Sequence, residues 1–147
     1  MEAFLQDVDL LWSADLTVGC AALDERNACM LDQLARAASV IASTDPSQLV
    51  AWANALYDQF DLLLLEEERE LAAADYPELL FHRRLHDRAR AMTAQARTKL
   101  QQASTPAAVA AAASQGCAAL GLWLPRHVVD ADRLFFPYVD RRFRGAG

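Results

Sequence analysis

The chain contains only three histidines, and their spacing would let them share one metal ion. His82 and His86 are four residues apart, so on a helix they lie on one face and reach the same point from consecutive turns. This spacing occurs in helix-borne zinc sites. His127, Glu67 and Asp132 add nitrogen and oxygen donors from other segments. Because the chain has no CxxC motif, this donor set suits iron, zinc or manganese better than a thiolate site.

Four helices are expected to position these donors. Pro46, Pro77 and Pro106 each follow a polar residue by one or two positions, which is typical of helix starts. The segments between them are rich in good helix formers, and none shows the alternation of a strand. Short connections make neighbours antiparallel, so we predict an all-α, up-down-up-down four-helix bundle in a single domain, residues 1–147. The expected elements are an N-terminal arm over 1–19 and helices over about 20–43, 46–74, 77–103 and 106–131.

Helical periodicity places most of the donors on inward faces. Glu67 lies at the centre of the apolar face of its helix, and a buried carboxylate costs several kcal/mol without a cation, a metal or a proton. An arginine partner is one alternative, but two histidines at i, i+4 favour a metal. His127 also lies on an apolar stripe, whereas Asp132 is about 140° away on an ideal helix. Pro125 is expected to kink this last helix by removing a backbone donor.

The same residues carry a resemblance to the hemerythrins, in particular to the bacterial single-domain members. The stretch 76–86 resembles their YP-x4-H-x3-H pattern, and 123–132 resembles their WL-x2-H-x4-D pattern. The opening of the chain resembles their W-x3-L-x-VG and DE-x-H patterns, and Glu66-Glu67 resembles the paired glutamates of their second helix. The residues that match are Trp12, Leu16, Val18, Gly19, Asp24, Glu25, Tyr76, Pro77, His82, His86, Trp123, Leu124, His127 and Asp132.

Two positions depart from the family pattern. Asn27 stands where the opening pattern ends in histidine, and Leu63 stands where histidine precedes Glu67 by four. The resemblance implies that those two histidines hold one iron of a pair, that His82, His86 and His127 hold the other, and that Glu67 and Asp132 bridge both. The chain would therefore keep one complete half-site and a degenerate second one.

Several residues could modify that second half-site. Asn27 faces inward, and we expect its amide to hydrogen-bond Glu67, Asp132 or a water molecule rather than a metal. Leu63 would partly fill the missing ion's place. Cys20 is an alternative thiolate ligand. Glu66 and Glu70 could serve as substitute ligands, although they and Glu68 are expected to be solvated, as are the arginines between His82 and Arg90.

Composition narrows the class of protein. The net charge is −6 and the pI about 4.9, which argues against general nucleic-acid binding. Three cysteines without framework spacing indicate a reducing compartment and no disulfide, and residues 1–19 lack the basic start of a signal peptide. No apolar run is expected to be long enough to span a membrane. We therefore expect a cytoplasmic protein. Leu62 and Leu65, on the outer side of their helix, could support a homo-oligomer.

Three functions remain open at this point. The first is a hemerythrin-like, non-haem iron protein of the oxygen-binding or oxygen-sensing kind, with one ion most favoured, two allowed, and dioxygen or another diatomic molecule as its ligand. The second is a two-metal, carboxylate-rich centre that reacts with oxygen or peroxide through substitute ligands. The third is a non-enzymatic regulatory or interaction bundle with one structural metal. Without a Ser/His/Asp set or a Gly-rich phosphate loop, a binding protein is favoured over an enzyme.

Overall fold

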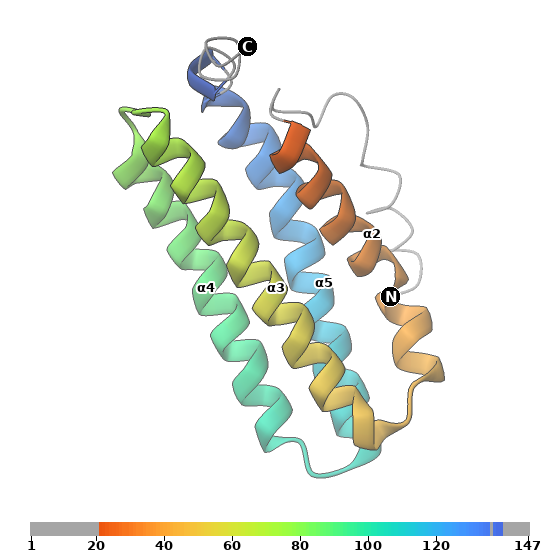
Figure 1. Cartoon of the computed structure of the whole chain (residues 1–147). Helices are drawn as coiled ribbons and strands as arrows, with labels where there is room; N and C mark the ends of the chain where they lie inside the picture. The colour runs from red at the N-terminus through yellow and green to blue at the C-terminus, as the bar shows by residue number, and fades with distance from the viewer. Residues whose placement is uncertain (1–20, 136, 140–147) are drawn as a thin grey trace.

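The computed structural model describes residues 21–135 and 137–139, which form four long helices packed side by side (Figure 1). Successive helices run in opposite directions, and the described part of the chain contains no strand. The predicted all-α, up-down-up-down four-helix bundle is therefore confirmed. Its helices are α2 (Ala21–Ser43), α3 (Pro46–Ala73), α4 (Leu79–Gln102) and α5 (Pro106–Asp130), followed by the short 3-10 helix η2 (Asp132–Phe135).

The expected N-terminal arm lies outside the described residues. The arm would include Trp12, Leu16, Val18 and Gly19, which carry part of the family resemblance. Cys20, the alternative thiolate ligand, also lies outside the described residues.

Polar caps and prolines start two of the helices. The Asp45 carboxylate accepts a hydrogen bond from the Ser47 N–H at 2.9 Å, and Pro46 follows as the first residue of α3. Thr105 caps α5 in the same way, its hydroxyl oxygen accepting from the Ala108 N–H at 3.1 Å. These caps supply partners for backbone donors that the first helical turn leaves free.

The α3–α4 connection shifts the start of the third long helix. Asp75 has φ 54°, in the left-handed region, and its N–H donates to Ala72 O. The Tyr76 N–H donates to Leu71 O at 3.0 Å, which completes the hydrogen-bond pattern of a Schellman motif. The backbone resumes a helix only at Leu79, two residues after the expected start at 77.

Helix α5 contacts all three other long helices as well as η2. Its sequence is dominated by alanine and leucine, and small residues such as Ala112, Ala113 and Gly116 face the core. By length and composition α5 is apolar enough to cross a membrane, so the expectation that no such run exists is wrong. Half of the apolar segment of α5 is buried within the bundle. The core helix of a helical bundle has the same length and composition.

Close packing at Gly116 leads to a stability prediction. A Cβ at this position would lie 2.9 Å from Cζ of the buried Tyr57 and 3.2 Å from the Ala96 Cβ, and nearer still to the Tyr57 hydroxyl. We expect Gly116→Ala to lower the free energy of unfolding by about 1–3 kcal/mol, as overpacking does. Denaturant titration measures this, with the exposed Gln115→Ala as a control.

A second variant separates the clash from a general intolerance of substitution. The Tyr57 hydroxyl is buried and has no hydrogen-bond partner among the described residues, so Tyr57→Phe removes an unsatisfied group. In that background Gly116→Ala should be less destabilising. An equal loss in both backgrounds would contradict the packing argument.

Candidate metal centre

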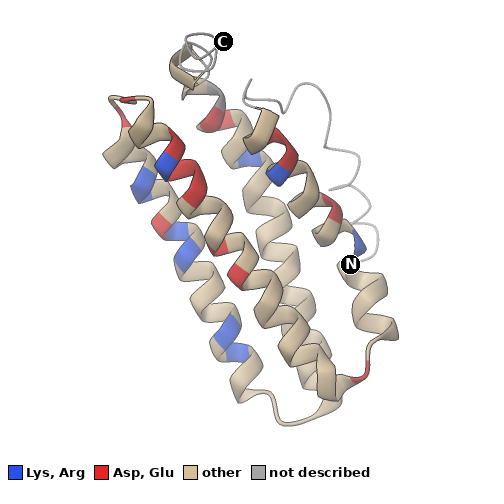
Figure 2. Ribbon diagram, in the orientation of Figure 1, with Lys and Arg blue, Asp and Glu red and all other residues tan. Residues whose placement is uncertain are grey.

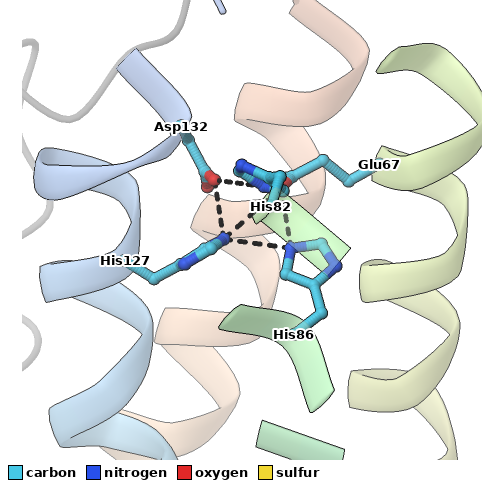
Figure 3. Close-up of side chains that lie close together, drawn as sticks. All are labelled: Glu67, His82, His86, His127 and Asp132. Atoms are coloured by element: carbon cyan, nitrogen blue, oxygen red, sulfur yellow. Dashed lines mark hydrogen bonds and ion pairs between the residues drawn. The ribbon is translucent and has the colours of Figure 1, made fainter. Parts of the chain in front are cut away.

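Five side chains from three helices and the turn after α5 converge inside one end of the bundle (Figure 3). Glu67 comes from α3, His82 and His86 from α4, His127 from α5 and Asp132 from η2. All five are buried, and one potential ligand atom from each lies within 4.8 Å of all the others. The structure thus brings together all five residues that the sequence predicts as metal ligands. Their role as ligands stays a prediction.

The imidazole Nε2 atoms and the two carboxylates face one point. Glu67 Oε1 lies 2.7 Å from His82 Nε2, 3.1 Å from His86 Nε2 and 3.5 Å from His127 Nε2. Asp132 Oδ1 lies 2.7 Å from His127 Nε2 and 3.2 Å from His82 Nε2. His86 Nε2 and His127 Nε2 are 3.0 Å apart. Each side chain therefore offers a lone pair to the same small volume.

The end of α5 explains how Asp132 joins the cluster despite the helical periodicity. The helix continues through Pro125 to Asp130, so the proline does not end it. Ala131, with φ −122° and ψ −50°, then leaves the helical conformation while its N–H still donates to His127 O at 2.9 Å. The 3-10 turn that follows directs Asp132 back over His127. An ideal helix would have pointed this carboxylate elsewhere.

The donor set fits a cation. Within the described residues, neither carboxylate oxygen of Asp132 forms a well-aligned hydrogen bond, although both are buried. Two Nε2 atoms at 3.0 Å can share only one proton between them, so protons alone satisfy this cluster incompletely. A metal ion accepts lone pairs from all five groups at once, with the nitrogen and carboxylate donors that iron, zinc and manganese accept.

In the metal-free protein, burial and neighbouring charges shift the pKa values of Glu67, His82 and His127 in opposite directions. Burial alone would raise the pKa of Glu67, but hydrogen bonds from His127, His82 and His86 lower it well below its ordinary value. Burial opposes charge on His127, yet Asp132 and Glu67 raise the pKa of its imidazole to about 9. The pKa of His82 is raised for the same reason, and burial together with the Glu67 charge raises the pKa of Asp132. Protons thus supply the positive charge that two buried carboxylates demand.

Glu68 was expected to be solvated, and this expectation is wrong. The side chain is buried, and its Oε2 lies 3.3 Å from His86 Nδ1, at ion-pair distance but without a well-aligned hydrogen bond, on the far side of that ring from the cluster. Arg90 forms an ion pair with the same oxygen, and Arg83 Nε lies 3.5 Å from Oε1. Arg83 and Arg90 therefore contact Glu68, the carboxylate beside His86, and do not point entirely into solvent. A carboxylate behind an imidazole favours the tautomer that presents a free Nε2 lone pair.

The contact between Glu68 and His86 leads to a prediction. We expect Glu68→Gln to weaken metal binding about 10–100-fold, because the neutral amide lacks the negative charge that favours a proton on His86 Nδ1. Competition with a chromophoric chelator, using zinc, measures the affinity. Glu66→Gln is the matched control, since Glu66 pairs with Arg26 at 2.8 Å and lies outside the cluster. Equal affinities in both variants would show that Glu68 does not position His86.

The other half of the site carries few donors. Asn27 is buried as predicted, but its Nδ2 has no hydrogen-bond partner within the described residues. The predicted hydrogen bond from its side-chain amide to Glu67 or Asp132 is therefore not formed. Leu63 is 7% exposed and belongs to the hydrophobic core. Glu66 and Glu70 are not part of the five-residue cluster.

The described cysteines and the two outer leucines of α3 can be compared with the expectations of free thiols and of an exposed leucine pair. Cys29 is exposed, Cys117 is buried, and both are free thiols. Burial raises the pKa of Cys117 to about 12, so this thiol stays protonated. Leu62 and Leu65 are exposed on α3, as the helical periodicity indicates.

A four-helix bundle that buries three histidines and two carboxylates around one point defines a non-haem metal-binding class of protein. The family model of the hemerythrin HHE cation-binding domain matches residues 21–139, and the chain belongs to this family. The family resemblance seen in the sequence is therefore confirmed. No curated protein and no solved structure gives a significant match to the chain.

Proposed function

We propose that this protein binds one iron ion per chain, held by Glu67, His82, His86, His127 and Asp132, and presents it to dioxygen or another small diatomic molecule. The observation that carries the proposal is the convergence of five buried ligand atoms within 4.8 Å of one another. These five residues would hold the ion, and iron would supply affinity for a small external ligand. Zinc and manganese accept similar donors and are the competing metals.

A bound iron ion supplies a redox-active centre with affinity for small diatomic molecules. The chain's own residues control access to it. Trp123 stacks on the His127 ring, with centroids 4.2 Å apart and planes 16° apart. Tyr76 and Phe135 pack edge-on against His82 at 6.3 and 5.7 Å. These aromatic side chains fix the imidazoles and exclude bulk water from the buried carboxylates.

The two-metal alternative requires substitute ligands on the side of Asn27 and Leu63. Glu66, one candidate, forms an ion pair with Arg26 at 2.8 Å and would have to break it. The third alternative, a regulatory bundle with a structural metal, draws support from Leu63, which adds packing where a ligand would stand.

We also propose that this is a cytoplasmic binding protein rather than an enzyme, and that it acts without nucleic acid or membrane.

Elemental analysis of anaerobically purified protein tests the proposal. We expect about one iron per chain after loading with ferrous ion, and a spectral change when nitric oxide, a diatomic probe, is added. His86→Asn should lower the iron content strongly, whereas the control Glu66→Gln should not. Iron-loaded protein that takes up no nitric oxide would leave the structural-metal alternative as the better account.

Proton release should accompany metal binding. Metal needs a neutral imidazole, while the pKa of His127 is raised to about 9 in the metal-free protein. At pH 7 binding should therefore expel at least one proton, and the apparent affinity should rise with pH up to about 9. The stability of the metal-free fold depends on pH in the opposite direction to the metal affinity. Its stability from the charged His127 is complete below about pH 6.5 and is lost as the pH rises through about 9.

Calorimetric titration with zinc in two buffers of different ionisation enthalpy counts the released protons. A binding enthalpy that is the same in both buffers at pH 7 would contradict the raised pKa of His127.

A further inference from the structure

A groove lies between α4 and α5, on the outer side of the metal cluster. Its volume is about 420 Å³, within the range of roughly 300–1,000 Å³ that small-molecule sites occupy. His127 lines the groove and also belongs to the metal cluster. Most of the lining is apolar, and it includes Leu85, Met92, Ala119, Leu122 and Trp123.

Charged residues are scarce along helix α5, and those that it has lie at the groove. Apart from His127, helix α5 has two ionisable residues that are charged at neutral pH, Arg126 and Asp130, and both line the groove. Arg88 lines it from α4. In Figure 2 basic segments accordingly occur along α4 and near the C-terminal end of α5. Two arginines against one aspartate give this groove a positive balance, although the chain as a whole carries −6.

Arg88 and Arg126 are available to a ligand. Within the described part of the chain, neither forms a hydrogen bond or an ion pair, whereas Arg26, Arg83, Arg90 and Arg97 all contact carboxylates. A guanidinium that contacts no carboxylate, beside apolar surface, is well suited to recognise a carboxylate through charge-assisted hydrogen bonds.

The two arginines lie at about the same height along the bundle. Arg88 is two residues after His86, Arg126 is one residue before His127, and His86 and His127 meet at 3.0 Å. Leu85 and Met92 border the groove on either side of Arg88, about 10 Å apart along the helix axis. Below the arginines lie Met92, Ala119 and Leu122, which offer apolar contact to a chain of medium length.

We propose that this groove binds a small amphipathic carboxylate of the medium-chain fatty-acid class. Arg88 and Arg126 hold its carboxylate, and its alkyl chain packs against Met92, Leu122 and the Trp123 indole. The groove shares His127 with the metal cluster, but the proposed contacts to the carboxylate and the alkyl chain need no metal, so the failure of either proposal leaves the other standing.

Titration of the full-length protein with octanoate tests the proposal, with 1-octanol as the uncharged probe of matched length. Trp123 lines the groove, so its fluorescence reports binding in a variant in which Trp12 and Trp52 are replaced by phenylalanine. Isothermal calorimetry on the unaltered chain gives the affinity. We expect octanoate to bind at least tenfold more tightly than octanol, because a hydrogen bond to a charged group contributes about this factor. Higher salt should narrow the difference.

Two variants assign the binding to this groove. Arg88→Gln with Arg126→Gln should weaken octanoate binding at least tenfold and leave octanol binding nearly unchanged. Arg84→Gln is the matched control, since Arg84 is an exposed arginine of α4 that does not line the groove. Ala119→Phe should weaken both probes by filling the apolar part. All measurements are made on metal-free and metal-loaded protein, and both forms should bind octanoate.

Three results would overturn the proposal. The first is equal affinity for octanoate and octanol, which would mean that the arginines do not recognise the charge. The second is an octanoate affinity that survives the double arginine substitution in a correctly folded protein. The third is the absence of any calorimetric or fluorescence change up to the critical micelle concentration of octanoate.

Discussion

Removal of the bound metal should lower the melting temperature of this protein by about 20 °C or more. Structural metal sites contribute on the order of 10 kcal/mol, and each kcal/mol shifts the melting temperature of a domain near this size by about 2–4 °C. The physical reason is the burial of Glu67 and Asp132, which need a cation in place of water. Raised pKa values of His127 and His82 replace part of that charge in the metal-free protein, so we expect a destabilised fold rather than an unfolded chain.

Differential scanning calorimetry before and after treatment with a chelator measures this effect. Re-addition of iron or zinc should restore the higher melting temperature, which separates metal loss from irreversible damage. The double variant Glu67→Gln, His127→Gln serves as the control, because it should melt at the same temperature with or without chelator. An unchanged melting curve for metal-free wild-type protein would show that protons satisfy the cluster as well as a metal does.

Much of the cluster could be predicted because regular helices translate spacing into direction. His82 and His86 are four residues apart on α4, and Glu67 lies at the centre of an apolar face, so periodicity places all three inward. Asp132 is different, since it follows the end of α5 and its direction depends on the conformation of Ala131. Only the family resemblance indicated its place, because local periodicity does not describe a helix end.

Glu68 was missed for a different reason. It is adjacent to Glu67, so on an isolated helix it points about 100° away from the core stripe. In the bundle that direction faces α4, where Arg83, His86 and Arg90 follow one another at spacings of three and four residues. This arginine–histidine–arginine stripe was visible in the sequence and was a signal for an acidic partner. Which helix supplies that partner depends on tertiary packing.

We further expect no more than about one tightly bound metal per chain and no oxygen-sensitive optical band of the two-iron kind. A second ion would have Glu67 and Asp132 as its shared ligands, but the positions for its own histidines hold Asn27 and Leu63. Leu63 belongs to the hydrophobic core, and Glu66 is engaged by Arg26. Two carboxylates alone should hold a second iron ion far more weakly than a full ligand set does.

The double substitution Asn27→His, Leu63→His should supply the missing ligand pair. Both positions are buried, Leu63 lies one helical turn before Glu67 on α3, and α2, which carries Asn27, packs against α3, so the new imidazoles have a short path to Glu67. We expect this variant to take up a second iron ion and to gain the optical band. Asn27→Gln with Leu63→Gln is the matched control, because it introduces polar groups of similar bulk without an imidazole. If the unaltered protein already holds two irons per chain and shows the band, substitute ligands such as Cys20 or Glu70 complete the second site, and the two replaced histidines are not what limits it.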